Sequence, residues 1–519
     1  MFQATAGKAG NRGSGSSISG AATHRDHLLG LLNWLLPDDG IFANVKFHGN
    51  TSWSPRQLVI QALCWAWSAS KNLTDAFDDS RKWSSRLLGT CPFASYTGFM
   101  GAMARWHVTF IDLLGPVLHA KMNEIAGPFW SYLQWVPIAF DGSRTTVPRT
   151  KSNEKAFCAP NYGGSRTAEY RRKKRQKPRR GTASAKRKKK RTVTRARIQA
   201  AQAARKQQTE QKTEPQSAPQ APQIWITMLW HMRLRLPWMW RLGPSNSSER
   251  EHVLEMLETG DFPQNTLFCG DAGFIGFPFW SAILNRGYQF LVRVGANVNL
   301  LSENADFEVD EDGHVLCWPV AQRDANHLPL RLRLVKVVSG KTNVWLLTSI
   351  LDCQQLTKDQ ILKLYKMRWG IEVEFRGLKQ TLDQGTLGSR RDVRAFVELH
   401  WSILAMAVAE LLALKEQLAG KSPQATPGCT PDPIQRSLAQ TMRALRNCLS
   451  ELDSPPEPNK DLMTLLRTAV VDFYQRTSSK AARHRKVNPD KKPLGDPKVR
   501  TMLEDEKAKL QSIAERQAI

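Results

Sequence analysis

Four polar residues at fixed intervals, Tyr365, Arg368, Glu372 and Lys379, form the stretch of this sequence best suited to chemistry. At about 100° per residue, a helix would bring them into an arc of roughly 60°. One phenol, one carboxylate and two cations would then share one side of the helix. A charged row is usually no more than a solvated helix face, so this row needs acids from elsewhere in the chain before it indicates a site.

Two aspartates follow short apolar runs that are typical of buried strands. Asp141 comes directly after residues 135–140 (WVPIAF), and Asp271 is separated from residues 265–269 (NTLFC) by Gly270 alone. We therefore expect each acid at the C-terminal end of a strand. The alternative is that each is only part of a turn, since Asp-Gly after a strand ordinarily marks one.

A long helix is expected to carry the charged row. Residues 357–382 contain no Pro and two Gly, each of which costs a helix only about 1 kcal/mol. The apolar residues form a stripe beside the row, so the helix should bury the stripe and hold the row at its edge. Glu374 falls about 160° from Glu372, on the far side of the stripe. This geometry predicts that Glu372, and not Glu374, belongs to the site.

Further elements are expected around these acids. Two strands joined by a turn are predicted within residues 224–242, followed by a helix from a capping box at Ser248 to about Glu258. Strands at 288–294 and 345–349 flank a β-rich stretch at 297–343. The order is strand with Asp, two strands, helix, strand with Asp and a later helix with Glu. This is the order of a ribonuclease-H-like α/β fold, in which the three acids would converge.

The spacing Tyr-(2)-Arg-(3)-Glu-(6)-Lys resembles the signature helix of the DDE transposases of bacterial insertion sequences, in the insertion sequence 4 family. Residues 141–143 (DGS) and 271–274 (DAGF) look like the two Asp elements of that family. The resemblance covers roughly residues 25–415. The basic stretch 171–223 and the long C-terminal region depart from the family pattern.

The resemblance implies that Asp141, Asp271 and Glu372 are the catalytic carboxylates and the metal ligands. Three carboxylates without partner cations would repel one another, so we expect the site to need a divalent metal. Hard oxygen ligands select Mg²⁺ or Mn²⁺. Two ions about 3.5–4 Å apart would serve an in-line phosphoryl displacement.

DNA-binding residues are also implied by the resemblance. Tyr365, Arg368 and Lys379 would grip DNA phosphates near the acids. Trp345 stands 20 residues before Tyr365, and a Trp at a similar place in the family stacks on a base flipped from a DNA hairpin. Such stacking is worth roughly 1–3 kcal/mol per base. The alternative for Trp345 is that it merely fills the core at a strand end.

The charge of the chain agrees with a nucleic-acid partner. Its 519 residues carry a net charge of +27, which implies a polyanion: double-stranded DNA first, an anionic membrane surface second. No apolar run reaches the roughly 18 residues of a membrane span. The eight cysteines are scattered without a CxxC pair, and no signal region is evident, so we expect a bacterial cytoplasmic, nucleoid-associated protein.

The expected fold class is α/β: a ribonuclease-H-like catalytic domain with a β-rich insertion, an α-helical N-terminal domain and a helical C-terminal region. The expected parts are a disordered tail (1–24), a helical DNA-end-binding domain (25–126), the catalytic domain (127–415) and a helical region with a basic tail (416–519). Within the catalytic domain, 171–223 is expected to be a disordered basic insertion and 297–343 the β-rich one. Residues 171–206 alone hold 18 Lys or Arg and no acid.

The sequence therefore predicts a cut-and-paste DDE transposase that acts on transposon ends and target DNA as a homodimer in a synaptic complex. Two alternatives stay open. One is a transposase-derived DNA-binding protein that no longer cleaves, against which the retention of all three acids argues. The other is a basic RNA-binding protein whose carboxylates are structural.

Overall fold

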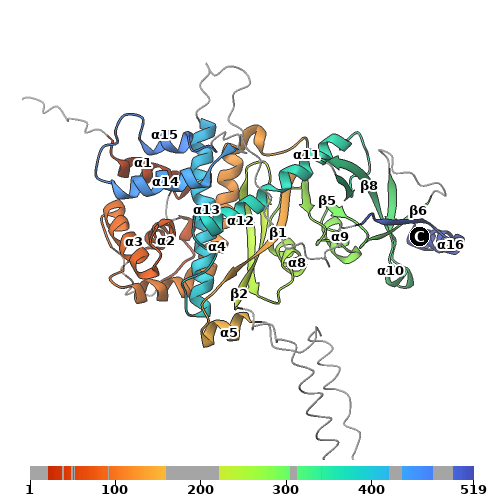
Figure 1. The fold of residues 1–519 in the computed structure, drawn as a ribbon, viewed down its shortest axis with the longest axis horizontal. Helices are drawn as coiled ribbons and strands as arrows, with labels where there is room; N and C mark the ends of the chain where they lie inside the picture. Colours follow the sequence, from red (N-terminus) through yellow and green to blue (C-terminus); the bar gives the residue numbers. More distant parts are fainter. Residues whose placement is uncertain are drawn as a thin grey trace, which may run out of the picture.

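A computed structural model gives the protein a mixed α/β fold with one large sheet and many helices (Figure 1). The structure describes residues 22–518 except 38–39, 48–50, 52, 92, 159–220, 304–312, 341, 420–434 and 472–494. Most of the expected tail (1–24) and of the basic insertion (171–223) therefore lies outside the described residues. Thr23 and His24, at the end of that expected tail, already belong to the cap and first turn of α1.

Helices build the N-terminal part of the chain, as the sequence predicts. Ser54 caps α2 in a capping box with Gln57, and Pro55 is the first helical residue, where its missing N–H costs nothing. The helical segments of this part are α1 (His24–Leu35), η1 (Gly40–Phe42), α2 (Pro55–Trp67), α3 (Leu73–Leu88), α4 (Tyr96–Ala126) and η2 (Gly127–Phe129).

A ten-stranded mixed sheet forms the rest of the core, in the order β10-β6-β7-β8-β9-β5-β4-β1-β2-β3. Strand β4 runs parallel to both β1 and β5, whereas β2 is antiparallel to β1 and to β3. The strands are β1 (Val136–Thr146), β2 (Gln223–His231), β3 (Leu236–Pro244), β4 (Thr266–Gly270), β5 (Gln289–Val294), β6 (Asn299–Ser302), β7 (His314–Cys317), β8 (Leu330–Ser339), β9 (Thr342–Thr348) and β10 (Lys498–Thr501).

Strand β1 is longer than the sequence indicates. We expected it to end at Phe140, with Asp141 at its C-terminal end, but it continues to Thr146. Its pairing with β4 stops at Ala139, whereas its pairing with β2 continues to the last residue of the strand. Asp141 thus lies within the strand, two residues beyond the point where one of the two neighbouring strands is lost.

The expected helix at 357–382 is interrupted. Thr357 caps α11 (Lys358–Arg368), and α12 (Gly370–Gln380) follows after Trp369. At this junction Trp369 N donates to Lys366 O and Glu372 N to Trp369 O, which are the shorter-range bonds of a tightened turn. The prediction of one regular helix was therefore wrong at this residue, and the Trp369 side chain, 55% exposed, projects outward.

The shorter helices connect and cover the strands. Helix α8 follows β3 from an N-cap at Ser248, as the sequence predicts. These helices are α5 (Lys151–Phe157), α8 (Glu249–Thr259), α9 (Phe277–Leu284) and α10 (Val320–Asp324).

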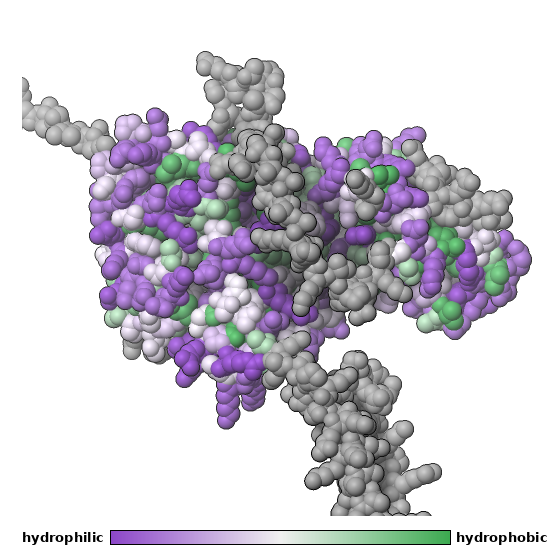
Figure 2. Space-filling model, viewed as in Figure 1, coloured by the Kyte–Doolittle hydropathy of each residue, from purple (hydrophilic) through white to green (hydrophobic). Residues whose placement is uncertain are grey.

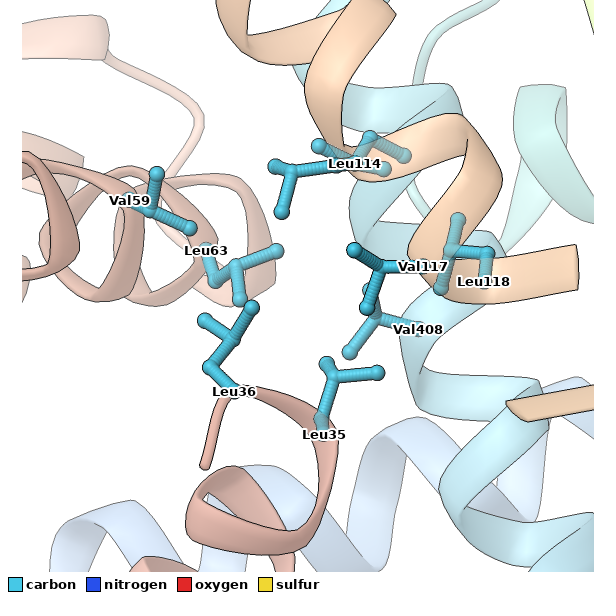
Figure 3. A pocket seen from close by; sticks show the side chains of 9 residues that line it. Leu35, Leu36, Val59, Leu63, Leu114, Val117, Leu118 and Val408 are labelled. Atoms are coloured by element: carbon cyan, nitrogen blue, oxygen red, sulfur yellow. The ribbon is translucent and has the colours of Figure 1, made fainter. Parts of the chain in front are cut away.

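Helix α13 (Asp392–Ala419) is the packing centre of the molecule and contacts α2, α4, β3, α14 (Leu438–Ser450) and α15 (Leu462–Arg467). Leucine and valine side chains of α1, α2, α4 and α13 point toward one another around an apolar crevice (Figure 3). One hydrophobic core contains residues of the N-terminal helices, of the sheet region and of the C-terminal helices, which the sequence analysis treats as three separate parts. By length and composition α13 could cross a membrane, but 94% of its apolar stretch is buried inside the protein.

The β-rich stretch around 297–343 extends the sheet away from the helical part (Figure 1). Strand β10 forms this edge of the sheet and pairs in parallel with β6, and α16 (Glu504–Ala518) follows β10 in the chain. Met502 and Ile513 of this segment form a second, small hydrophobic core with Leu301, Leu316 and Trp318. The face seen in Figure 2 is largely hydrophilic, with apolar residues in small separate areas.

Candidate active site

All three of the acids that the sequence predicts line one open pocket of about 480 Å³. Asp141 comes from β1, Asp271 from the turn after β4, and Glu372 from the first turn of α12. Its remaining lining residues are Gly142, Ser143, Phe375, Arg376, Lys379 and Gln380. Carboxylates that are more than 100 residues apart in the chain are thus gathered at one edge of the sheet.

The parallel pairing of β1 and β4 brings the two aspartates together. Ala139 of β1 lies opposite Cys269 of β4, so each aspartate is two residues beyond the same pair. Between them, Gly270 approaches the Phe140 ring so closely that any side chain at 270 would collide with it. The Asp271 side chain then stabilises the turn that follows β4, because its Oδ1 accepts a hydrogen bond of 2.8 Å from Gly273 N. Gly270 therefore allows β1 and the end of β4 to pack closely just before the two aspartates.

Arg368, the last residue of α11, lies between two of the acids. Its Nη1 is 3.6 Å from Asp141 Oδ2, and its Nη2 donates to Glu372 Oε1 at 3.2 Å. Its side chain is only 8% exposed. Arg368 is therefore a partner cation for two of the carboxylates, buried against them, and the sequence reasoning did not include this pairing.

Burial is the largest influence on Asp141. It raises the pKa of this carboxyl from 3.8 to about 6, although the Gly142 N–H and Arg368 both act to lower it. The charges of Asp271 and Glu372 make a smaller contribution to this rise in the pKa. The pocket therefore makes the ionised form of Asp141 less favourable than it is in water.

Lys379 joins the same site from the last turn of α12. Its Nζ donates a hydrogen bond of 2.7 Å to Ser143 Oγ, and partial burial lowers the pKa of its ammonium. Ser143 is a site residue that the sequence did not single out as a partner. Tyr365 lies on α11, half-buried against the core, and does not line the pocket.

Trp345 also lies outside this pocket, on β9. It pairs with Val294, the last residue of β5, so it lies at the same edge of the sheet as Asp271, two strands away. Its Nε1 donates to Asp496 Oδ1 at 2.6 Å, and Lys336 Nζ lies 5.3 Å from the ring centre. The half-buried indole is therefore neither a core residue alone nor a free stacking surface.

Glu374 points away from the pocket, on the side of α12 that the helical geometry assigns to it. It is 7% exposed and shares a hydrogen bond with Glu410 of α13, near Arg436. Burial and the charge of Glu410 raise the pKa of Glu374 well above its ordinary value. This carboxyl is a structural group that links α12 to α13.

A fourth carboxylate, which the sequence reasoning missed, approaches the acids from α8. Glu249 is half-buried, and burial followed by the charges of Asp141 and Asp271 raises its pKa to about 7. In the sequence it is concealed as the first residue after the Ser248 cap. Only the three-dimensional structure reveals its proximity to Asp141, which is more than 100 residues away in the chain.

The chemistry of this donor set fits a hard divalent cation, since carboxylate oxygens are the ligands that Mg²⁺ and Mn²⁺ prefer. Among the residues that the structure describes, however, no three His, Cys, Asp or Glu side chains form a ready-made metal cluster. The Arg368 guanidinium contacts oxygens of both Asp141 and Glu372. The ligands are gathered, but two of them are paired to a cation of the protein itself.

Comparison with known proteins gives the family. Residues 138–408, just over half of the chain, match the family described as Transposase DDE domain, and the chain belongs to it. The chain is 25% identical over 202 aligned positions to "Putative transposase y4zB" of Sinorhizobium fredii (strain NBRC 101917 / NGR234), and the alignment covers 36% of this chain and about half (51%) of that relative. All three acids of the pocket lie inside the family match.

Among solved structures, the chain is similar to one titled "Cryo-EM structure of piggyBac transposase synaptic complex with hairpin DNA (SNHP)". The TM-score is 0.38 and the identity 11%, over 88% of each chain. A likeness this distant adds nothing to the family assignment.

Proposed function

We propose that this protein is a DDE transposase of the insertion sequence 4 type, which cleaves DNA at the inverted-repeat ends of its element and joins the ends to target DNA. The observation that carries the proposal is the pocket shared by Asp141, Asp271 and Glu372 within a Transposase DDE domain. The strand order β3-β2-β1-β4-β5, with β2 antiparallel and β4 parallel to β1, supports a ribonuclease-H-like centre. The four-residue signature on α11 and α12 supports the narrower family.

Asp141, Asp271 and Glu372 would hold the divalent ions, Mg²⁺ or Mn²⁺. When bound, two such ions supply activation of the attacking oxygen and stabilisation of the leaving oxygen in a phosphoryl displacement. The oxygen that attacks first would be that of water, which nicks the 3′ end of the element. The freed 3′-OH would then attack the opposite strand or the target, with no covalent bond between protein and DNA.

The cations of the site would position the DNA. Lys379 lines the open pocket beside Ser143, where its ammonium can contact a phosphate next to the scissile bond. Arg368 would first have to exchange its carboxylate partners for a phosphate, and filling of the metal sites by cations would favour that exchange. Double-stranded DNA is thus the proposed partner, bound by two copies of the chain in a synaptic complex.

A nicking assay tests the proposal. The substrate is DNA that carries the sequences flanking the reading frame, incubated with Mg²⁺, Mn²⁺ or EDTA. We expect cleavage with either metal and none with EDTA, and we expect Asp271→Asn to abolish cleavage while it leaves end binding largely intact. Normal cleavage by Asp271→Asn would show that the site is misassigned.

The alternative is a transposase-derived DNA-binding protein without cleavage activity. The retained acids and their common pocket do not favour it. The same assay separates the two functions, because a protein of the second kind would bind the ends in a gel-shift experiment and never nick them with any metal.

A further inference from the structure

The two faces of strand β1 are covered by different helices, and both of these helices bring a carboxylate to the same place. Side chains alternate along a strand, so Asp141 and Ser143 face one way and residue 142 faces the other. Helix α12 lies on the first side, where Lys379 bonds Ser143. Helix α8, which packs on β1, β2 and β3, lies on the second side with Glu249 at its first position.

The side chain of Glu249 occupies the space that a side chain at position 142 would fill. A Cβ atom built on Gly142 would lie 2.6 Å from Glu249 Cδ and 2.8 Å from its Cγ, which is closer than real Cβ atoms approach other atoms. Gly142 is therefore the reason that this carboxylate can lie against β1, near enough to Asp141 for the charge of Asp141 to act on it. A glycine here has a packing role that the turn interpretation of Asp-Gly does not require.

The cations near the acids are distributed unequally between the two sides. Arg368 neutralises Asp141 and Glu372 from the α12 side. On the α8 side, the charge of Arg144 acts on Glu249 to lower its pKa, and the Arg144 guanidinium stacks on the Trp225 ring at 4.0 Å. No described residue forms an ion pair with Glu249. The region around Asp141, Asp271 and Glu249 is thus the part of the site where the fewest cations compensate the negative charge.

We propose that Glu249 is a fourth carboxylate of the active site, which binds a divalent cation together with Asp141 and Asp271. The inference rests on the proposed function, since it adds a ligand to the metal site proposed there. It assigns to α8 a direct part in metal binding, on the side of β1 opposite the signature helix. It also gives Gly142 a definite role, namely to leave room for that ligand.

Titration of the full-length protein with Mn²⁺, followed by calorimetry in the absence of DNA, tests the inference. Removal of groups that support a metal ligand typically costs 10–100-fold in affinity, so loss of a ligand is expected to cost at least tenfold. We expect that weakening for Glu249→Gln and also for Gly142→Ala, which keeps the carboxylate but displaces it. Glu249→Asp should recover part of the affinity.

Glu255→Gln is the matched control, because Glu255 is an exposed acid of the same helix. It should bind Mn²⁺ as the unmodified protein does, and thermal melting should show that all four variants are folded. If Glu249→Gln binds Mn²⁺ normally while Asp141→Asn does not, Glu249 is no ligand and the proposed function still stands. If the unmodified protein binds no Mn²⁺ and cleaves no DNA, the proposed function fails together with this inference.

Discussion

Replacing Asp141 by Asn should stabilise the protein in the absence of divalent metal. The carboxyl is buried, with its side chain 17% exposed, and its pKa is raised from 3.8 to about 6. Because each tenfold change in proton affinity is worth about 1.4 kcal/mol, the ionised carboxylate makes the folded protein about 3 kcal/mol less stable. Asn has a similar shape and no charge, so it removes this cost.

The dependence on pH gives the prediction its sign. Below pH 3.8 the carboxyl is protonated in both the folded and the unfolded chain, and the substitution should change little. Between 3.8 and about 6 the unfolded chain ionises first, so the stability of the unmodified protein falls as the pH rises. The advantage of Asp141→Asn should therefore be about 1 kcal/mol at pH 4.5 and about 3 kcal/mol at pH 8.

Urea unfolding in EDTA at these two pH values measures the difference, with Glu255→Gln as the control that should show neither effect. Mg²⁺ at about a thousand times its dissociation constant should then reverse the order at pH 8, because a ligand that binds only the folded state stabilises it by about 4.1 kcal/mol at that concentration. An Asp141→Asn variant that is no more stable than the unmodified protein at pH 8 would refute the reasoning. It would mean that Arg368 compensates the charge fully.

Four further predictions concern DNA. Glu372→Gln should eliminate cleavage, whereas Glu374→Gln should reduce it less than tenfold, under about 1.4 kcal/mol of barrier; equal losses in parallel nicking assays would contradict the assignment of the two faces of α12. Arg368→Ala should weaken the binding of end DNA and change its salt dependence, measured by gel shift at several salt concentrations; an unchanged salt slope would argue against a phosphate contact. Trp345→Ala should impair strand opening or hairpin steps more than the first nick; equal slowing of all steps with a large loss of melting temperature would instead indicate a core role. Deletion of 171–220 should lower general DNA affinity and flatten its salt dependence, because fewer counterions are released; loss of soluble folded protein would contradict the prediction.

The sequence predicts the neighbourhood of the acids better than their detailed environment. Acids that follow two buried strands can be expected to meet if the strands are parallel neighbours, and Asp141 and Asp271 do line one pocket. The sequence does not show where β1 ends, because the residues after Asp141 are polar and pair with β2, which lies far along the chain. Local patterns cannot show a partner strand that comes after so long an insertion.

The helical pattern also does not show how deeply each side chain is buried. The arc that groups Arg368 with Glu372 is correct in direction, yet it cannot tell a solvated edge from a buried one. The structure buries Arg368 against two carboxylates, so the residue that seemed free for DNA already has partners. Glu249 was missed for a related reason, since its signal is the absence of a side chain at Gly142, which has meaning only once α8 is known to lie there.

Strand β10 has a consequence for the synthesis of the protein. It covers the outer side of β6, although its residues, 498–501, are made roughly 200 residues after residues 299–302 of β6. Until then β6 is a bare edge strand, whose unpaired N–H and C=O groups invite pairing with another chain. Nascent or truncated chains that lack residues 495–518 should therefore aggregate more readily than finished ones. A premature stop codon before this segment would yield an aggregation-prone protein.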